Sequence, residues 1–80
     1  SVHVKDLALM TRQLATLIRA NIPLVDALNA VAEQTENPTL SEAVADCKNQ
    51  VNEGAPLHKS LARYPHVFSK IYISIAEAGE

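Results

Sequence analysis

Tryptophan is absent from this sequence, aromatic residues make up only 4% of it, and it contains two glycines and one cysteine. Since 48% of the chain is nevertheless apolar, a core must be built mainly from Ala, Val, Leu and Ile, which suits closely packed helices. Two glycines cannot form a phosphate-binding loop, and the lone Cys47 excludes an internal disulfide. Cys47 lies in an apolar stripe at helical spacing, so we expect it to pack as a small hydrophobic residue.

Strong charge and long apolar runs are also missing. The formal net charge of −2 gives no global attraction to nucleic-acid phosphates. No apolar run approaches the roughly 18 residues needed to cross a bilayer, and no signal-peptide pattern opens the chain. The sequence therefore predicts a single small soluble domain over residues 1–80. Its abrupt final residues suggest a piece of a larger protein.

One short motif occurs twice, 33 residues apart, at 23–28 and again at 56–61. It consists of Pro-Leu, two variable positions, a small residue and Leu. Carried backwards at the same spacing, Leu14 aligns with Cys47 and Asn21 aligns with Gly54. The repeated unit is a helix, a polar turn and a proline-started helix. We therefore predict two pseudo-repeated helical hairpins, which leave little room for an active site and place function on the outer faces.

Apolar periodicity predicts an all-α fold, a small antiparallel bundle of about five helices with Leu14, Leu28, Val44 and Leu61 in its core. Ile71, Ile73 and Ile75 alternate as in a strand, but no second β-like run could pair with them, so a helix is favoured there. The expected helices cover residues 4–19, 23–35, 38–53 and 56–63, with a last one that begins after Ser69 as N-cap.

No residue pattern supports catalysis or a bound cofactor. His3, His58 and His66 lack metal-ligand spacing, and we expect them on the surface, in loops or at a frayed terminus. Glu77 and Glu80 stand three residues apart and could share a cation such as calcium with a partner chain, but a solvated helix end is the favoured interpretation. The sequence therefore predicts a protein that is not an enzyme.

Charged helix faces are the remaining candidates. Arg12 and Arg19 are seven residues apart, on one side of the first helix, and could dock an acidic partner, but a solvated charged face is the favoured interpretation. A DNA-reading helical hairpin is disfavoured because the helix over 38–53 carries Glu42, Asp46 and Glu53 against Lys48 alone.

Several separated motifs resemble the bacterial type II secretion system protein F family. In the first half these are the run 11–17 (TRQLATL), Pro23-Leu24 with Ala27-Leu28, Ala32-Glu33-Gln34 and Asn37-Pro38. In the second half they are Glu53-Gly54 with Leu57, Ser60-Leu61-Ala62, Tyr64-Pro65 with Val67-Phe68, and Ala78-Gly79-Glu80. The chain departs from the family at Asn21-Ile22, where Gly is common before Pro-Leu, and at Pro56, where Ser is common.

This resemblance implies a cytoplasmic docking domain of a polytopic inner-membrane platform protein, one without activity of its own. Such a protein couples a hexameric assembly ATPase to pilin-like subunits, in type II secretion or type IV pilus assembly. Family domains resemble bundles of about six helices, so this chain would form an incomplete one, and a second copy could cover its exposed apolar surface to give a homodimer. The residues hypothesised to meet the ATPase or other platform proteins are Arg12, Arg19, Asp26 and Glu33.

Two further functions stay open from the residues alone. The 33-residue spacing favours a soluble tetratricopeptide-like adaptor, although about three repeats are usually needed and the typical Trp, Gly and Tyr signals are missing. A DNA-binding helical domain would require duplex binding that this charge does not favour.

Overall fold

Five α-helices and no strand make up the computed structural model, which describes all residues 1–80. This confirms the all-α prediction, including the choice of helix over strand for the last element. None of the helices combines the length and the apolar character that crossing a membrane requires. In chain order the helices are α1 (Val4–Arg19), α2 (Leu24–Gln34), α3 (Pro38–Asn52), α4 (Leu57–Leu61) and α5 (Lys70–Gly79).

Polar side chains start three of the helices. Asn37 precedes Pro38, and its side chain accepts a hydrogen bond from the Leu40 amide at 3.0 Å, as predicted for an N-cap. Ser69 accepts in the same way from the Tyr72 amide. At α1 the cap is His3, which forms a reciprocal capping box with Asp6. The prediction of a frayed terminus at His3 is therefore wrong, because His3 acts as the first fixed residue of the helix.

The pseudo-repeat is present in the backbone. Asn21 and Gly54, which the 33-residue spacing aligns, are the two residues in the left-handed region, with φ of 63° and 107°. In both places the backbone amide of the following residue donates to a carbonyl five residues earlier, that of Ile22 to Leu17 at 3.1 Å and that of Ala55 to Gln50 at 3.0 Å. The same Schellman-type turn thus closes both α1 and α3.

Helix boundaries differ from the prediction at the starts of α2 and α4 and at the end of α4. Pro23 and Pro56 do not occupy the first helical turn but are N-caps with extended ψ values of 142° and 146°, so α2 and α4 each begin one residue later. α4 ends at Leu61 rather than near Arg63, because the amides of Arg63 and Tyr64 bond to carbonyls three residues back and tighten the chain into a turn.

The core is centred on α2 and α3, which each contribute four buried residues, while α1 contributes only Met10 and α5 none. Leu28, Val44, Leu61 and Cys47 are buried as predicted. Leu14 differs, since it is only half-buried and packs against the edge of the core. The buried apolar set is Met10, Ala27, Leu28, Val31, Ala32, Leu40, Ala43, Val44, Cys47, Leu61 and Phe68.

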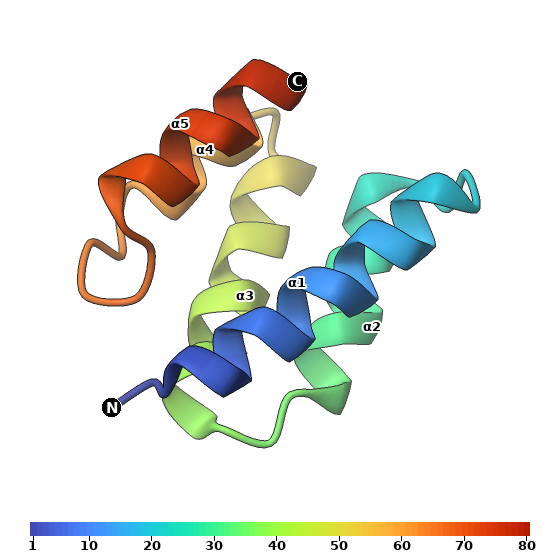
Figure 1. Cartoon of the computed structure of the whole chain (residues 1–80). Coiled ribbons are helices and arrows are strands. Elements are labelled where there is room, and N and C mark those ends of the chain that lie inside the picture. The colour runs from blue at the N-terminus through green and yellow to red at the C-terminus, as the bar shows by residue number, and fades with distance from the viewer.

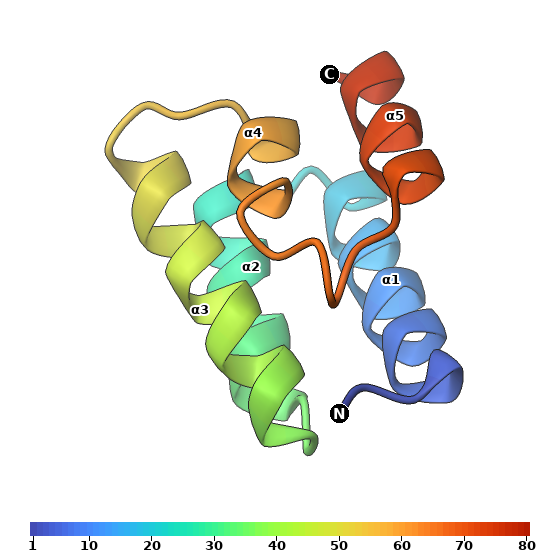
Figure 2. The ribbon, with the colours of Figure 1, turned by 90° about the vertical axis from the view of Figure 1, so that its left-hand side faces the viewer.

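Each helix packs on its neighbour in sequence, α1 on α2, α2 on α3, α3 on α4, and α4 on α5. Figure 1 shows α5 lying across α4, away from the α1–α2 hairpin. In the turned view of Figure 2, α2 and α3 form one side of the molecule, and α1 and α5 lie along the other. α1 and α5 are therefore two outer walls, α1 packed on α2 of the central α2–α3 pair and α5 joined to that pair through α4.

Candidate functional site

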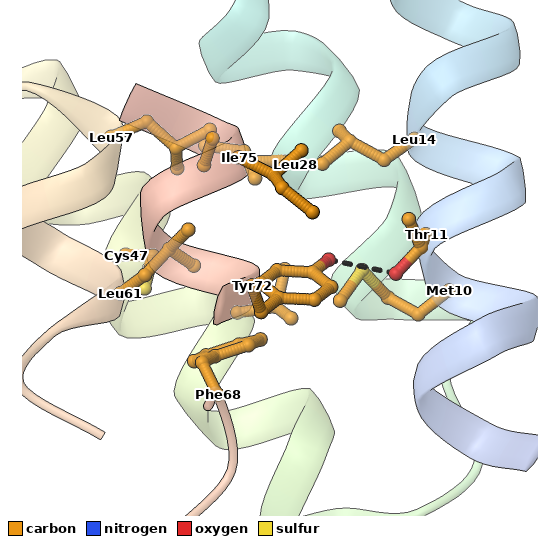
Figure 3. Close-up of a pocket in the computed structure, with 12 residues that line it drawn as sticks. Met10, Thr11, Leu14, Leu28, Cys47, Leu57, Leu61, Phe68, Tyr72 and Ile75 are labelled. Atoms are coloured by element: carbon orange, nitrogen blue, oxygen red, sulfur yellow. Dashed lines mark hydrogen bonds between the residues drawn. The ribbon is translucent and has the colours of Figure 1, made fainter. Parts of the chain in front are cut away.

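An apolar groove of about 310 Å³ lies between α1 and α5, and the outer-face prediction did not foresee it. Met10 and Leu14 of α1 form one wall, and Tyr72, Ile75 and Ala76 of α5 form the other. The floor and end come from the core helices and α4: Leu28, Val44, Cys47, Leu57, Leu61 and Phe68. Figure 3 shows these side chains converging on the same space. The groove can therefore receive apolar side chains.

One hydrogen bond spans the groove. The hydroxyl oxygens of Thr11 on α1 and Tyr72 on α5 are 2.7 Å apart, the dashed line in Figure 3. Thr11 also donates its only hydroxyl hydrogen to the Leu7 carbonyl at 2.7 Å, so Tyr72 must be the donor to Thr11. Burial raises the pKa of the Tyr72 hydroxyl above its usual value. This phenol therefore stays neutral and ties the two walls together across 61 residues of sequence.

α1 and α5 also expose apolar side chains to solvent. Ile71 and Ile75 of α5 are 73% and 68% exposed, and Ile18 of α1 is 44% exposed. Residues 71 and 75 are four apart and so lie on one face of α5. The groove and this face form a continuous apolar region, because Ile75 belongs to both.

The four predicted partner-binding residues are all exposed, and none takes part in an intramolecular ion pair. The structure brings them onto one helical hairpin, with Arg12 and Arg19 on α1 and Asp26 and Glu33 on α2. They do not line the groove. The hairpin therefore presents a basic helix beside an acidic one, with all four charges free to meet a partner.

His58 is the residue that sequence reasoning missed most clearly. Its side chain is 21% exposed and faces two carboxylates of α5: its Nδ1 contacts Glu80, and its Nε2 lies 3.6 Å from Glu77. Glu80 also accepts from the backbone amides of Leu57, at 2.7 Å, and His58, at 3.1 Å. Glu77 and Glu80 are exposed at the end of α5, as expected, but they also face a histidine, which was not expected.

The structure lends no geometric support to a cation at Glu77 and Glu80. No group of three or more His, Cys, Asp and Glu side chains converges in a way that could hold a metal ion. One carboxylate oxygen of Glu77 and one of Glu80 instead face the ring nitrogens of His58.

A second polar cluster fixes the turn after α4. Tyr64 donates its phenolic hydrogen to Asp46 of α3, and Gln50 donates to the same carboxylate oxygen at 2.7 Å. The hydrogen bond to Asp46, with smaller effects of burial and of the Asp46 charge, raises the pKa of Tyr64 to about 12. Through this hydrogen bond Tyr64 fixes the start of the 64–69 segment, which leads into α5, to α3.

Cys47 lies beneath the groove, fully buried. Burial, with a smaller effect of the neighbouring Asp46 carboxylate, raises the pKa of its thiol to about 11. A thiol held neutral is a poor nucleophile, which agrees with the packing role expected for this residue.

Residues 10–80 match the family model described as type II secretion system (T2SS), protein F. The chain is 46% identical over 79 residues to the type II secretion system protein F of Vibrio cholerae, covering 99% of this chain and 20% of that protein. It is 48% identical over 75 residues to the type II secretion system protein F of Aeromonas hydrophila, and this match covers 94% of this chain and 19% of that protein.

Proteins of pilus assembly are also similar. The type IV pilus assembly protein PilC of Myxococcus xanthus is 37% identical over 79 residues, which cover 99% of this chain and 19% of that protein. The chain therefore spans about one fifth of the length of the curated relatives it matches.

Proposed function

Since this chain belongs to the type II secretion system protein F family, we propose that it is a docking domain on the cytoplasmic face of the bacterial inner membrane, one that couples an assembly ATPase to pseudopilus or pilus assembly. The family consists of platform proteins of secretion and pilus assembly, and family membership confirms that this domain is not an enzyme. The same match leaves the tetratricopeptide-like and DNA-binding alternatives without support. On this proposal, residues 1–80 form one domain of a longer, polytopic membrane protein.

The observation that carries the docking proposal is the exposed, unpaired charge of the α1–α2 hairpin. Arg12 and Arg19 would meet carboxylates of the partner, while Asp26 and Glu33 would meet its basic side chains. Complementary charges of this kind orient two proteins and speed their encounter, and they also exclude partners with the wrong charge pattern. None of the four side chains would have to break an intramolecular ion pair in order to bind.

The test is the affinity of the chain for the purified assembly ATPase of the same secretion system, measured by isothermal titration calorimetry. The double variant Arg12→Glu with Arg19→Glu should lose about tenfold or more in affinity, a loss of about 1.4 kcal/mol. The double variant Lys59→Glu with Lys70→Glu is the matched control, because it makes the same change of charge at exposed positions of α4 and α5.

We expect the control to bind within about twofold of the unchanged chain, since surface charges away from an interface have little effect on affinity. Equal binding by both double variants would refute the contact at Arg12 and Arg19. Absence of binding by the unchanged, folded chain would refute the coupling to the ATPase and direct the search to the other platform proteins.

We also propose that the apolar region over the groove allows a second copy of the chain to associate. The exposed Ile71 and Ile75 support this proposal, because contiguous exposed apolar surface commonly marks an interaction site. Sedimentation velocity should show a concentration-dependent dimer that Ile75→Glu abolishes. Only monomer at millimolar concentration would refute it.

A further inference from the structure

The end of α5 is held against the start of α4 by one cluster of ionisable side chains. Glu80 caps α4 by accepting from the amides of Leu57 and His58, and it also contacts the His58 ring. Glu77, one turn earlier on α5, faces the other ring nitrogen at 3.6 Å. Both nitrogens of a single imidazole are therefore directed at carboxylates of a neighbouring helix.

This arrangement is best satisfied by a protonated ring. An imidazolium has a donor on each nitrogen, whereas a neutral imidazole has one donor and one lone pair, and the lone pair would then face a carboxylate. Glu77 and Glu80 are the only charged groups within ion-pair distance of the ring, so no other side chain compensates for a lost proton. Histidine is the side chain whose charge ordinarily changes between about pH 5 and 8.

Glu80 remains charged through this range. Partial burial acts to raise the pKa of its carboxyl, but hydrogen bonds from the His58 side chain and from the amides of His58 and Leu57 outweigh it and lower that pKa overall.

Loosening this contact would change the groove. Leu57 on α4 and Ile75 and Ala76 on α5 line the groove next to the cluster, and Cys47 lies beneath them. α5 has no buried residue, and besides this cluster its only hydrogen bond to a distant side chain is that of Tyr72 with Thr11. α5 is therefore held by the partly buried side chains of Tyr72, Ile73 and Ala76 together with these polar contacts.

We propose that His58, Glu77 and Glu80 form a pH-sensitive clasp, which holds the end of α5 on α4 while the imidazole is protonated and lets α5 open away from the groove once the imidazole is neutral. This proposal concerns the motion of α5 alone and does not depend on the docking function.

Cys47 provides the measurement, because it is the single thiol of the chain and is covered by the groove walls. The rate at which 4,4′-dithiodipyridine labels Cys47 is compared with the rate for the same chain unfolded in urea at the same pH. The ratio of the two rates gives the protection of the thiol. Between pH 5.5 and pH 8, protection should fall about two- to fivefold, the factor that an exposed ion pair is typically worth.

Two histidine variants distinguish the clasp from a general effect of pH. His58→Gln should show low protection at both pH values, with no fall between them. His66→Gln is the matched control, because His66 is exposed and has no ion-pair partner, and it should reproduce the unchanged chain. A fall that persists in His58→Gln, or constant protection in the unchanged chain, would overturn the proposal.

Glu80→Gln is a second variant that tests the clasp by the same thiol-protection measurement if His58→Gln does not fold. Its amide oxygen can still accept from the α4 amides, while the charge that attracts the imidazolium is gone. We expect its protection at pH 5.5 to equal that of the unchanged chain at pH 8. Full protection at pH 5.5 would show that the charge of Glu80 does not hold α5 and would overturn the clasp.

Discussion

The α2–α3 pair and the two outer walls differ in how they are held. α2 and α3 contribute eight of the buried residues between them, whereas α1 contributes one and α5 none. Apart from Met10, the walls pack on the core through partly buried side chains such as Leu14 and Ala76, and two polar contacts add to this packing, those of Thr11 with Tyr72 and of His58 with Glu80. This contrast indicates that the α2–α3 pair supplies the stability of the domain, while the walls supply a surface that can adapt.

The largest expected effect comes from removing packing inside the α2–α3 pair. Leu40 of α3 is fully buried, so Leu40→Ala should lower the free energy of unfolding by about 2–5 kcal/mol. Leu9→Ala on α1 deletes the same atoms from a side chain that is 50% exposed, and it should cost well under half as much. Urea unfolding of both variants measures the difference, and equal losses would contradict the division of roles.

Alkaline pH should lower the stability of the fold through Cys47, beneath the groove, and Tyr64, which is bonded to Asp46. Because the pKa values of Cys47 and Tyr64 are raised to about 11 and about 12 in the fold, the unfolded chain gives up these protons first. The resulting stability is fully present below about pH 9 and is lost as the pH rises through 11 and 12. Urea midpoints measured from pH 8 to pH 11.5 should therefore fall, and Tyr64→Phe should fall less steeply.

The two pseudo-repeated turns should respond differently to substitution. Gly54 has a φ of 107°, so Gly54→Ala should cost about 1–2 kcal/mol through backbone strain, although an added Cβ would meet no atom within 4 Å. Asn21→Gly places the least restricted residue at a φ of 63° and should change stability by at most about 0.5 kcal/mol. Thermal unfolding compares them, and a neutral Gly54→Ala would contradict the strain.

Removing the hydrogen bond between the walls should cost less than the backbone strain at Gly54. Tyr72→Phe removes the hydrogen bond to Thr11 and leaves the Thr11 hydroxyl bonded to Leu7, so we expect a loss of about 0.5–1.5 kcal/mol. Thr11→Ala should add little in the Tyr72→Phe background if the two hydroxyls act through each other. A double-mutant cycle in urea measures this coupling, and additive losses would show that they act separately.

The sequence predicts most of the fold because the determining signals are local. Apolar spacing, the Asn37-Pro38 start and the repeated closing turns act over a few residues, and each was recognisable without structural knowledge. The helix starts at Pro23 and Pro56 were misplaced by one residue, since proline suits both the N-cap and the first turn, and only the backbone angles distinguish the two.

The site could not be predicted to the same degree. The groove depends on how far α5 stands from α1, and its two polar ties join residues 61 and 22 positions apart. No local pattern marks Thr11 for Tyr72 or His58 for Glu80, so His58 was assigned to the surface and the groove was not expected. The exposed charges of Arg12, Arg19, Asp26 and Glu33 and their place on the first helical hairpin were predictable from the sequence, but the absence of ion pairs among them required the fold.

Native-state hydrogen exchange, followed residue by residue by NMR, tests the contrast between the core pair and the walls most directly. We predict that amides in the middle of α2 and α3 exchange only through global unfolding, whereas those of α5 exchange at least about tenfold faster through local opening. Equal protection of α3 and α5 would contradict this, because it would show that the walls and the core unfold as one unit.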